Sequence, residues 1–264
     1  MTGCFAGESS MENDVQSQYR TADNLNTRIS LHARYSVNKQ GFGNWIASHY
    51  AFDPGMSVLE LGCGTGAMWQ GNTALLRCCR RFVLSDCSAA MLESARKNLS
   101  ACPEIDFSLI DIQQIPFPDD SFDAIIANMM LYHVPDPAKG LREVRRVLKD
   151  GGRFYCATYG ENGMMAAIGR MFEARQTETL VSARFTLQNG EAQLRSVFTN
   201  VERFLYEDAL AVTDLNDLID YILSLTSLSE LQKLPRETLR SVLERHMRDG
   251  VLTIPKEYGL FIST

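Results

Sequence analysis

The sequence predicts an α/β fold with a mostly parallel sheet of seven strands and helices on both faces. Three observations carry this prediction. Short apolar runs alternate with amphipathic segments between residues 57 and 158, the first run leads into a turn with three glycines, and the second ends in an acidic residue. Strands that alternate with helices along a chain are typical of a parallel sheet. Helical segments before the first strand and after residue 160 are expected to form an N-terminal cap and C-terminal insertions.

Size and composition narrow the function. The chain has 264 residues, 45% of them apolar, and a formal net charge of −6. This suits one domain of ordinary size with a sizeable core. The acidic balance argues against a nucleic-acid binder, which normally carries a basic face.

The cysteines and the hydropathy pattern suggest a location. Seven cysteines occur, with no C-x-x-C pair, and the first ten residues lack the pattern of a signal peptide. No apolar run approaches the roughly 20 residues needed to cross a bilayer. We therefore expect reduced thiols, a cytoplasmic location and no membrane partner.

The glycine-rich turn is the strongest local signal. The apolar run Ser57–Leu61 is followed by Gly62, Gly64 and Gly66 at alternate positions, and Glu60 stands two residues before the first of them. Glycine has no Cβ, so the backbone can adopt positive φ and approach a ligand closely. A turn of this kind between a strand and a helix predicts a nucleotide-type binding loop.

A second signal follows the next strand. Residues 81–85 form an apolar run that ends at Asp86, about 20 residues beyond the glycines, where a carboxylate can accept hydrogen bonds from both hydroxyls of a ribose. As an alternative, Asp86 or Ser88 caps the helix expected over residues 89–99. Met91 of that helix either lines an adenine pocket or belongs to the core.

The remaining elements follow from periodicity and from turn residues. Further strands are expected at 105–110, 123–127, 153–158, 201–206 and 258–263, the last antiparallel at the sheet edge. Further helices are expected over 67–77, 137–148, 164–175, 186–197, 214–225 and 236–248. The basic residues of helix 137–148, including Arg145 and Arg146, are expected mostly on its solvated face.

Three segments together resemble a known family. Residues 60–66 closely resemble motif I of class I S-adenosylmethionine-dependent methyltransferases. Residues 128–136 are similar to the segment after the fourth strand in methyltransferases of the ubiquinone/menaquinone-biosynthesis type, and Leu-Lys-Asp-Gly-Gly at 148–152 is also a family feature. The resemblance covers roughly residues 55–158. It implies a Rossmann-like fold, S-adenosylmethionine as the methyl donor and S-adenosylhomocysteine as the product.

The resemblance also implies site residues. Asp111 is expected to take the adenine amino group, unless it is a turn carboxylate, and the backbone N–H of Ile112 to meet a ring nitrogen. Asn128 is expected beneath the methionine part of the cofactor. The full set expected to bind the cofactor is Glu60, Gly62, Cys63, Gly64, Gly66, Asp86, Cys87, Met91, Asp111, Ile112 and Asn128.

The reaction implied is in-line attack of an O, N, C or S nucleophile on the sulfonium methyl group, for which alignment and exclusion of water are the main tasks. The N/D-P-P-Y/F motif of exocyclic or amide nitrogen methylases is absent, since residues 128–131 read Asn-Met-Met-Leu. A small-molecule acceptor is therefore expected. His133 is the candidate base; alternatively it packs against the glycine loop and orients the backbone. Asp111 and Asp123 do not make a clear case for a metal site.

These expectations divide the chain into an N-terminal helical lid (1–50), a cofactor-binding core (51–160), and the rest of the sheet with insertions that form the acceptor pocket (161–264). The first segment alternatively covers one sheet edge. Its candidate acceptor contacts are Tyr19, Arg28, His32 and Tyr35. A monomer or a homodimer is expected. The competing functions are a nicotinamide-dependent oxidoreductase and a non-catalytic protein that binds S-adenosylmethionine.

Overall fold

The computed structural model describes residues 22–172, 184–225 and 228–264. Contacts divide the chain into two compact units. The sheet unit comprises residues 40–161, 182–207 and 257–264, and the helical unit comprises the described parts of 1–39, 162–181 and 208–256. The lid, core and acceptor-pocket roles of the three segments expected from the sequence stay a prediction.

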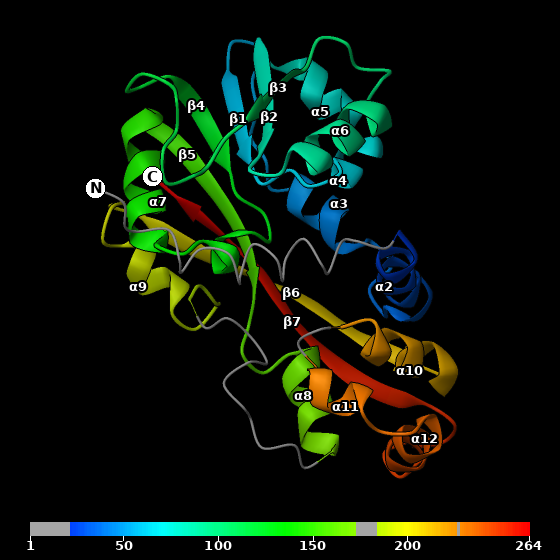
Figure 1. The fold of residues 1–264 in the computed structure, drawn as a ribbon. Coiled ribbons are helices and arrows are strands. Elements are labelled where there is room, and N and C mark those ends of the chain that lie inside the picture. The colour runs from blue at the N-terminus through cyan, green and yellow to red at the C-terminus, as the bar shows by residue number, and fades with distance from the viewer. Residues whose placement is uncertain (1–21, 173–183, 226–227) are drawn as a thin grey trace, which may run out of the picture. The chain divides into compact units, whose positions relative to one another are not determined.

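A seven-stranded sheet confirms the predicted α/β class (Figure 1), with strand order β3-β2-β1-β4-β5-β7-β6. The strands are β1 (Ser57–Leu61), β2 (Arg81–Asp86), β3 (Asp106–Leu109), β4 (Phe122–Ile126), β5 (Leu148–Tyr159), β6 (Val201–Val212) and β7 (Leu252–Ser263). The pairs among β1 to β5 are parallel, and β7 runs antiparallel to β5. The expectation that the last strand lies at the sheet edge was wrong, because β7 lies between β5 and β6.

Strand β1 lies inside the sheet, and all five of its residues are buried. It pairs with β2 on one side and with β4 on the other, so that Glu60 stands level with Leu84 and with Ile126. The carboxyl ends of these three strands therefore meet at one edge of the sheet, where open α/β sheets bind ligands.

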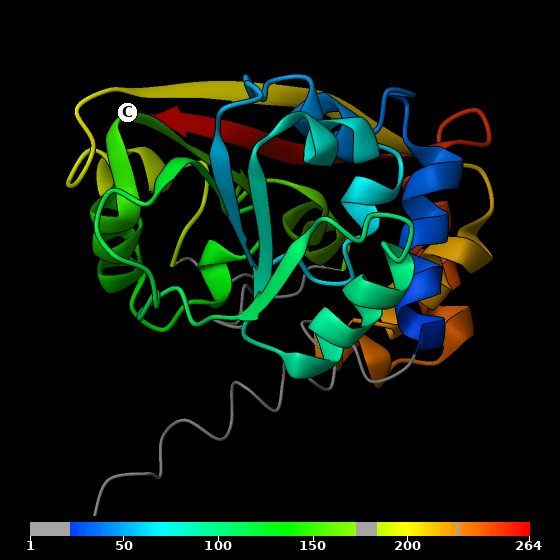
Figure 2. The same cartoon turned by 90° about the horizontal axis from the view of Figure 1, so that it is seen from above.

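The two faces of the sheet are covered by different helices. On one face, Leu59 and Leu61 share a core with Leu141 of α7 (Pro137–Val147) and Leu194 of α9 (Gly190–Leu194). On the other, Val58 packs with residues of α3 (Phe42–Ala47), α4 (Ala67–Gln70) and α5 (Thr73–Cys78). Helix α6 (Ala89–Asn98) contacts β2, β3 and α4. Figures 1 and 2 show α7 and the helices α4 to α6 on opposite sides of the strands.

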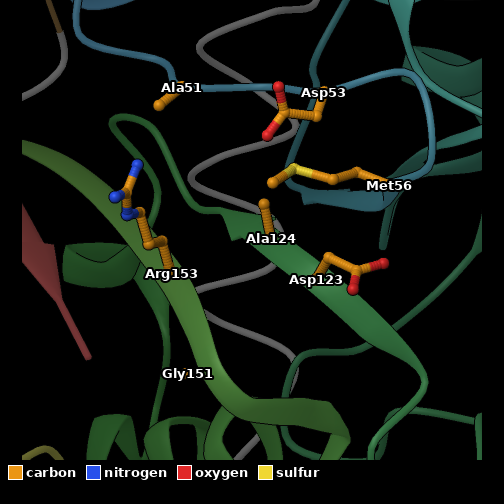
Figure 3. Close-up of a pocket in the computed structure, with 7 residues that line it drawn as sticks. All are labelled: Ala51, Asp53, Met56, Asp123, Ala124, Gly151 and Arg153. Atoms are coloured by element: carbon orange, nitrogen blue, oxygen red, sulfur yellow. The ribbon is translucent and has the colours of Figure 1, made fainter.

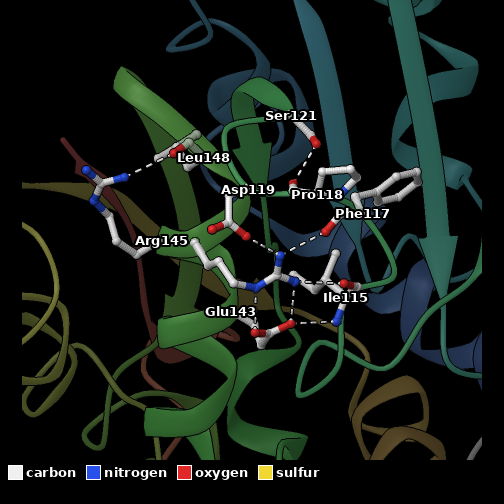
Figure 4. A network of polar contacts seen from close by, with 9 residues as sticks. Ile115, Phe117, Pro118, Asp119, Ser121, Glu143, Arg145 and Leu148 are labelled. Atoms are coloured by element: carbon white, nitrogen blue, oxygen red, sulfur yellow. Dashed lines mark hydrogen bonds and ion pairs between the residues drawn. The ribbon is translucent and has the colours of Figure 1, made fainter.

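Arg146 joins α7 to the loop that leads into β4. Figure 4 shows its partners Glu143, Asp119, Phe117 and Ile115 gathered at this junction. Its guanidinium binds the carboxylates of Glu143 and Asp119 at 2.8 and 2.9 Å, and also donates to the carbonyl oxygens of Phe117 and Ile115. Arg146 is therefore only partly solvated, with a side chain 31% exposed, whereas the basic residues of this helix were expected mostly on a solvated face. A guanidinium with its donors in a fixed fork can hold several acceptors together, which explains its use at this junction.

The helical unit contains α2 (Ala22–Tyr35), α8 (Met164–Met171), α10 (Leu215–Leu223), α11 (Ser229–Gln232) and α12 (Arg236–Glu244), with residues 208–212 of β6 and 252–256 of β7. Its apolar core includes Leu31 of α2, Ile168 of α8 and Ile219 of α10. An ion pair between Lys256 and Asp208 lies within the unit, and the two side chains are 4% and 0% exposed.

No helix in the described ranges has both the length and the apolar character that a membrane span requires.

Candidate cofactor site

The three glycines after β1 have different surroundings although all have positive φ, at 73°, 57° and 68°. A Cβ on Gly62 would lie 2.9 Å from the Met130 side chain, and a Cβ on Gly66 would lie 2.9 Å from Leu99. A Cβ on Gly64 would meet no atom within 4 Å. The outer two glycines therefore allow close packing within the protein, whereas Gly64 faces open space in which a ligand can approach the backbone.

Asp86 fixes this loop from the end of β2. Its Oδ2 accepts a hydrogen bond from the Gly64 N–H at 2.9 Å, and its Oδ1 accepts one from the Ser88 N–H at 2.9 Å. The Ser88 hydroxyl oxygen in turn accepts from the Met91 N–H and caps α6. Each oxygen of an ionised carboxylate has a second acceptor site, so Asp86 can still receive ribose hydroxyl groups.

Glu60 lies buried at the end of β1. Its Oε2 accepts a hydrogen bond of 2.5 Å from the indole Nε1 of Trp69 in α4. Burial raises the pKa of Glu60 to about 7, the indole hydrogen bond opposes this rise, and the charge of Asp86 adds to it. A titratable carboxyl group therefore stands beside the glycine loop.

The raised pKa gives a prediction about stability. Between pH 4.5 and about 7 the folded chain retains a proton on Glu60 that the unfolded chain has lost. Stability from this group therefore falls as pH rises through that window, by at most about 1.4 kcal/mol per pH unit. Glu60→Gln keeps an acceptor for Trp69 and removes the titration. We measure the free energy of unfolding of both proteins by urea denaturation. We expect the value for Glu60→Gln minus the value for the wild type to increase from pH 5 to 7 and to stay constant above pH 7.

The measurement must compare the variant with the wild type at each pH, because His32 also titrates and changes stability with pH in the direction opposite to Glu60. Burial, then the charge of Lys256, lower the pKa of His32 to about 4, so its contribution to stability rises with pH between about 4 and 6.5. Subtracting the wild-type curve removes this background. Glu202→Gln, at an exposed position of β6, is the matched control. A difference for Glu60→Gln that stays constant from pH 5 to 8 would refute the assignment.

The segment after β4 lies beside the loop. Asn128 stands two residues beyond Ile126, which pairs with Glu60 in the sheet. Met129 has a φ of 53°, which is uncommon for a residue other than glycine. It is Met130 that packs on Gly62, whereas His133 ends a short 3₁₀ turn and is exposed.

The other predicted cofactor residues occupy varied positions. The Cys63 N–H donates to the Ser85 carbonyl oxygen at 2.8 Å, and Cys87 is exposed. Asp111 is exposed and accepts from the Gln113 N–H at 2.8 Å, as a turn carboxylate does. The side chain of Ile112 is buried against Gly140. The adenine contacts of Met91, Asp111 and Ile112 stay predictions.

The predicted acceptor residues lie in the helical unit, apart from Tyr19, which is outside the described residues. Arg28 donates to the Ser224 carbonyl oxygen, and the Tyr35 hydroxyl donates to Asp217. The His32 ring lies edge-on to Tyr221, with ring centroids 6.0 Å apart. Their role toward an acceptor stays a prediction.

A pocket of about 160 Å³ lies elsewhere in the sheet unit (Figure 3). It is lined by Ala51, Asp53, Met56, Asp123, Ala124, Gly151 and Arg153. Asp123 and Ala124 are at the start of β4, so this pocket belongs to the amino-terminal edge of the sheet. None of the predicted site residues lines it, and it is not the cofactor site.

Comparisons with known proteins agree with the geometry. Residues 59–156, which hold the glycine loop, Asp86 and Asn128, match the family model described as a methyltransferase domain. A demethylmenaquinone methyltransferase from Clavibacter sepedonicus is 36% identical over 151 residues, which are 55% of this chain and 55% of that protein. A ubiquinone/menaquinone biosynthesis C-methyltransferase from Hahella chejuensis is 36% identical over 126 residues, 47% of each chain.

Residues 59–156 are therefore similar to the methyltransferase domain of class I S-adenosylmethionine-dependent methyltransferases. The family's cofactor is S-adenosylmethionine, as the sequence predicted. The chain spans about half the length of the curated relatives it matches.

Solved structures extend the likeness in fold. The YcgJ protein from Bacillus subtilis superposes with a TM-score of 0.57 at 18% identity, covering 84% of this chain and 96% of that one. The phosphoethanolamine N-methyltransferase 2 of Haemonchus contortus, in complex with phosphomonomethylethanolamine and S-adenosylhomocysteine, has a TM-score of 0.61 at 15% identity, covering 98% and 61%. At these identities the likeness shows the fold alone, and the predicted Rossmann-like architecture is confirmed.

The glycine loop and Asp86 form a site that fits S-adenosylmethionine, the cofactor of the similar family. Gly64 leaves room at the backbone, and a carboxylate with spare acceptor sites stands next to it. Sequence reasoning missed Trp69, which binds Glu60, and Tyr50, which binds Asn128. Their only signal was that both are aromatic residues close to the first strand.

Within the described ranges no three His, Cys, Asp or Glu side chains gather as metal ligands, and the expectation of no metal stays a prediction.

Proposed function

We propose that this methyltransferase moves the methyl group of S-adenosylmethionine to a nucleophilic atom of a small molecule. The open approach to Gly64, with the Asp86 carboxylate bound to its N–H at 2.9 Å, is the observation that carries the proposal. This cradle accepts a ligand that brings hydroxyl groups to a carboxylate and lies flat against a backbone without side chains.

Different residues of the site bind different parts of the cofactor. Asp86 orients the ribose, and Glu60 and Asn128 stand where the amino acid part would lie, at the carboxyl ends of β1 and β4. The cofactor supplies an activated sulfonium methyl group, so the protein mainly aligns the acceptor and excludes water.

An aromatic wall follows β4 and β5 in the sheet unit. The ring of Tyr132 lies 4.4 Å from that of Tyr159 and 4.4 Å from that of His133, centroid to centroid. His133 is exposed at the surface, but neighbouring protein displaces part of the water around its ring, and this and then the charge of Arg184 lower its pKa. A neutral imidazole at pH 7 can accept a proton from an acceptor, which supports His133 as the base for acceptors that must lose one.

One similar structure suggests a second candidate function for this fold. The [4+2]-cyclase SpnF superposes with a TM-score of 0.57 over 99% of this chain and 98% of its own, at 18% identity. A protein named for another reaction thus shares the fold, and fold alone does not fix the chemistry. The expected nicotinamide alternative gains no support from any of the similar proteins described above.

Calorimetric titration with S-adenosylmethionine, S-adenosylhomocysteine, NAD and NADP tests the proposal first. We expect binding of the first two alone. Incubation with S-adenosylmethionine and a panel of small O, N, C and S nucleophiles should then release S-adenosylhomocysteine. Binding of a nicotinamide nucleotide in their place would refute the cofactor, and binding without turnover on any acceptor would favour a non-catalytic or non-transferring role.

A further inference from the structure

The side-chain oxygen of Asn128 is buried and has no hydrogen-bond partner among the described residues. The amide nitrogen of the same side chain has two partners: it donates to the Tyr50 hydroxyl at 2.6 Å and lies 3.6 Å from the sulfur of Met68. Both of its hydrogens are thus used. A buried acceptor without a donor costs free energy, so this oxygen needs an explanation.

The position of the oxygen suggests a ligand. Asn128 follows β4 two residues after Ile126, the partner of Glu60, at the edge of the sheet where Asp86 meets the glycine loop. The carboxyl group of Glu60 is close enough to Tyr50 to affect its ionisation. An unused acceptor beside an acidic group is suited to a cationic hydrogen-bond donor.

Tyr50 is held rigidly. Its ring stacks on Phe52 and Trp69, with centroids 4.9 and 6.0 Å away, and meets Tyr155 edge-on at 5.0 Å. Burial raises its pKa well above 10, so the hydroxyl keeps its proton at any working pH. The ring cannot turn aside, and its hydroxyl accepts from the amide nitrogen of Asn128, so that the amide oxygen points away from Tyr50.

We propose that Tyr50 is a positioning residue that presents the Oδ1 of Asn128 to the ammonium group of the cofactor's amino acid part. The inference rests on the proposed function. The ammonium group supplies hydrogen-bond donors and a positive charge, whereas the sulfonium has no hydrogen to donate. Tyr50 thereby acts on the cofactor only through Asn128.

Two ligands separate this role from a structural one. S-adenosylhomocysteine carries the ammonium group, and 5′-methylthioadenosine keeps the adenosine and the sulfur but lacks the amino acid part. We expect Tyr50→Phe to weaken the Kd for S-adenosylhomocysteine about tenfold or more and the Kd for 5′-methylthioadenosine less than about twofold. Tyr155→Phe is the matched control: it belongs to the same aromatic cluster, but its hydroxyl accepts from the Ala51 N–H at 3.2 Å. It should change neither Kd.

A Tyr50→Phe variant that weakens both ligands equally, or neither, would overturn the inference. If thermal unfolding shows that this variant is not folded, Asn128→Leu must give the same selective loss, and an unselective loss would count against the inference equally. Wild-type protein that binds neither ligand would refute the proposed function and the inference with it. Wild-type protein that binds both, with a ratio unchanged in Tyr50→Phe, would refute the positioning role alone.

Discussion

Gly64→Ala is expected to remove most of the affinity for S-adenosylhomocysteine while leaving the protein folded. The new Cβ meets no protein atom within 4 Å, so its structural cost is that of alanine at a φ of 57°, about 1–2 kcal/mol. The same methyl group occupies the space through which a ligand approaches the loop. The hydrogen bonds that the ribose hydroxyl groups of the ligand donate to the Asp86 carboxylate would then lengthen or break. Each is worth about 1.5–3 kcal/mol, or roughly 10- to 150-fold in Kd.

Gly66→Ala, two residues further on, is the matched control for that prediction. It has a similar φ of 68°, but its Cβ would lie 2.9 Å from Leu99 and 3.4 Å from Ala95. Overpacking adds about 1–3 kcal/mol to the backbone cost. We expect Gly66→Ala to lower the free energy of unfolding clearly more than Gly64→Ala does. Calorimetric titration and urea denaturation of both variants measure the two effects, and equal affinity losses with equal stability losses would contradict the division of roles.

Lys256→Ala should destabilise the protein strongly, by about 3–5 kcal/mol, because it leaves a buried carboxylate without its counter-charge. The Asp208 side chain is fully buried, and it also accepts from the N–H groups of Asn38 and Ala209, at 2.9 and 2.8 Å. Lys256 also donates to the Ser36 hydroxyl at 2.9 Å, so the substitution removes two contacts of one ammonium group. Urea denaturation followed by circular dichroism measures the loss.

The control for Lys256 is an ion pair with similar geometry on the surface. Lys97 and Glu93 are 2.8 Å apart, but their side chains are 73% and 69% exposed. Exposed pairs of this kind contribute little to stability, so Lys97→Ala should leave the urea midpoint nearly unchanged. If Lys256→Ala is as stable as Lys97→Ala, the prediction is wrong. The Asp208 carboxylate would then become hydrated or protonated in the variant with no loss in the free energy of unfolding.

The part of the fold that the sequence predicted is the part with local signals. The bounds of β1 were predicted to the residue, because a short apolar run ends at glycines that permit positive φ. The end of β2 at Asp86 followed from the spacing of an acidic residue. Helix 67–77 was predicted as one segment and is two, α4 and α5, which are separated by Gly71 and Asn72.

The rest depended on contacts between distant residues. Tyr50 and Asn128 are 78 positions apart, and nothing near either of them indicates a hydrogen bond. Arg146 looked like a solvated residue of an amphipathic helix, yet three of its four partners, Ile115, Phe117 and Asp119, lie 27 to 31 positions earlier in the chain. The place of β7 inside the sheet is equally non-local, since a strand's sequence does not state which neighbours it will pair with.

The position of β7 has a consequence for folding during synthesis. Strand β6 is made before β7, but its place in the sheet lies on the far side of β7 from β5. While the ribosome adds residues 213–251, β5 has no neighbour on that side and β6 has no strand to join. Both then expose unpaired N–H and C=O groups that favour association with other chains. We therefore expect nascent chains that stop before residue 252 to be held by chaperones or to aggregate, and the final strand to complete the sheet in one late step.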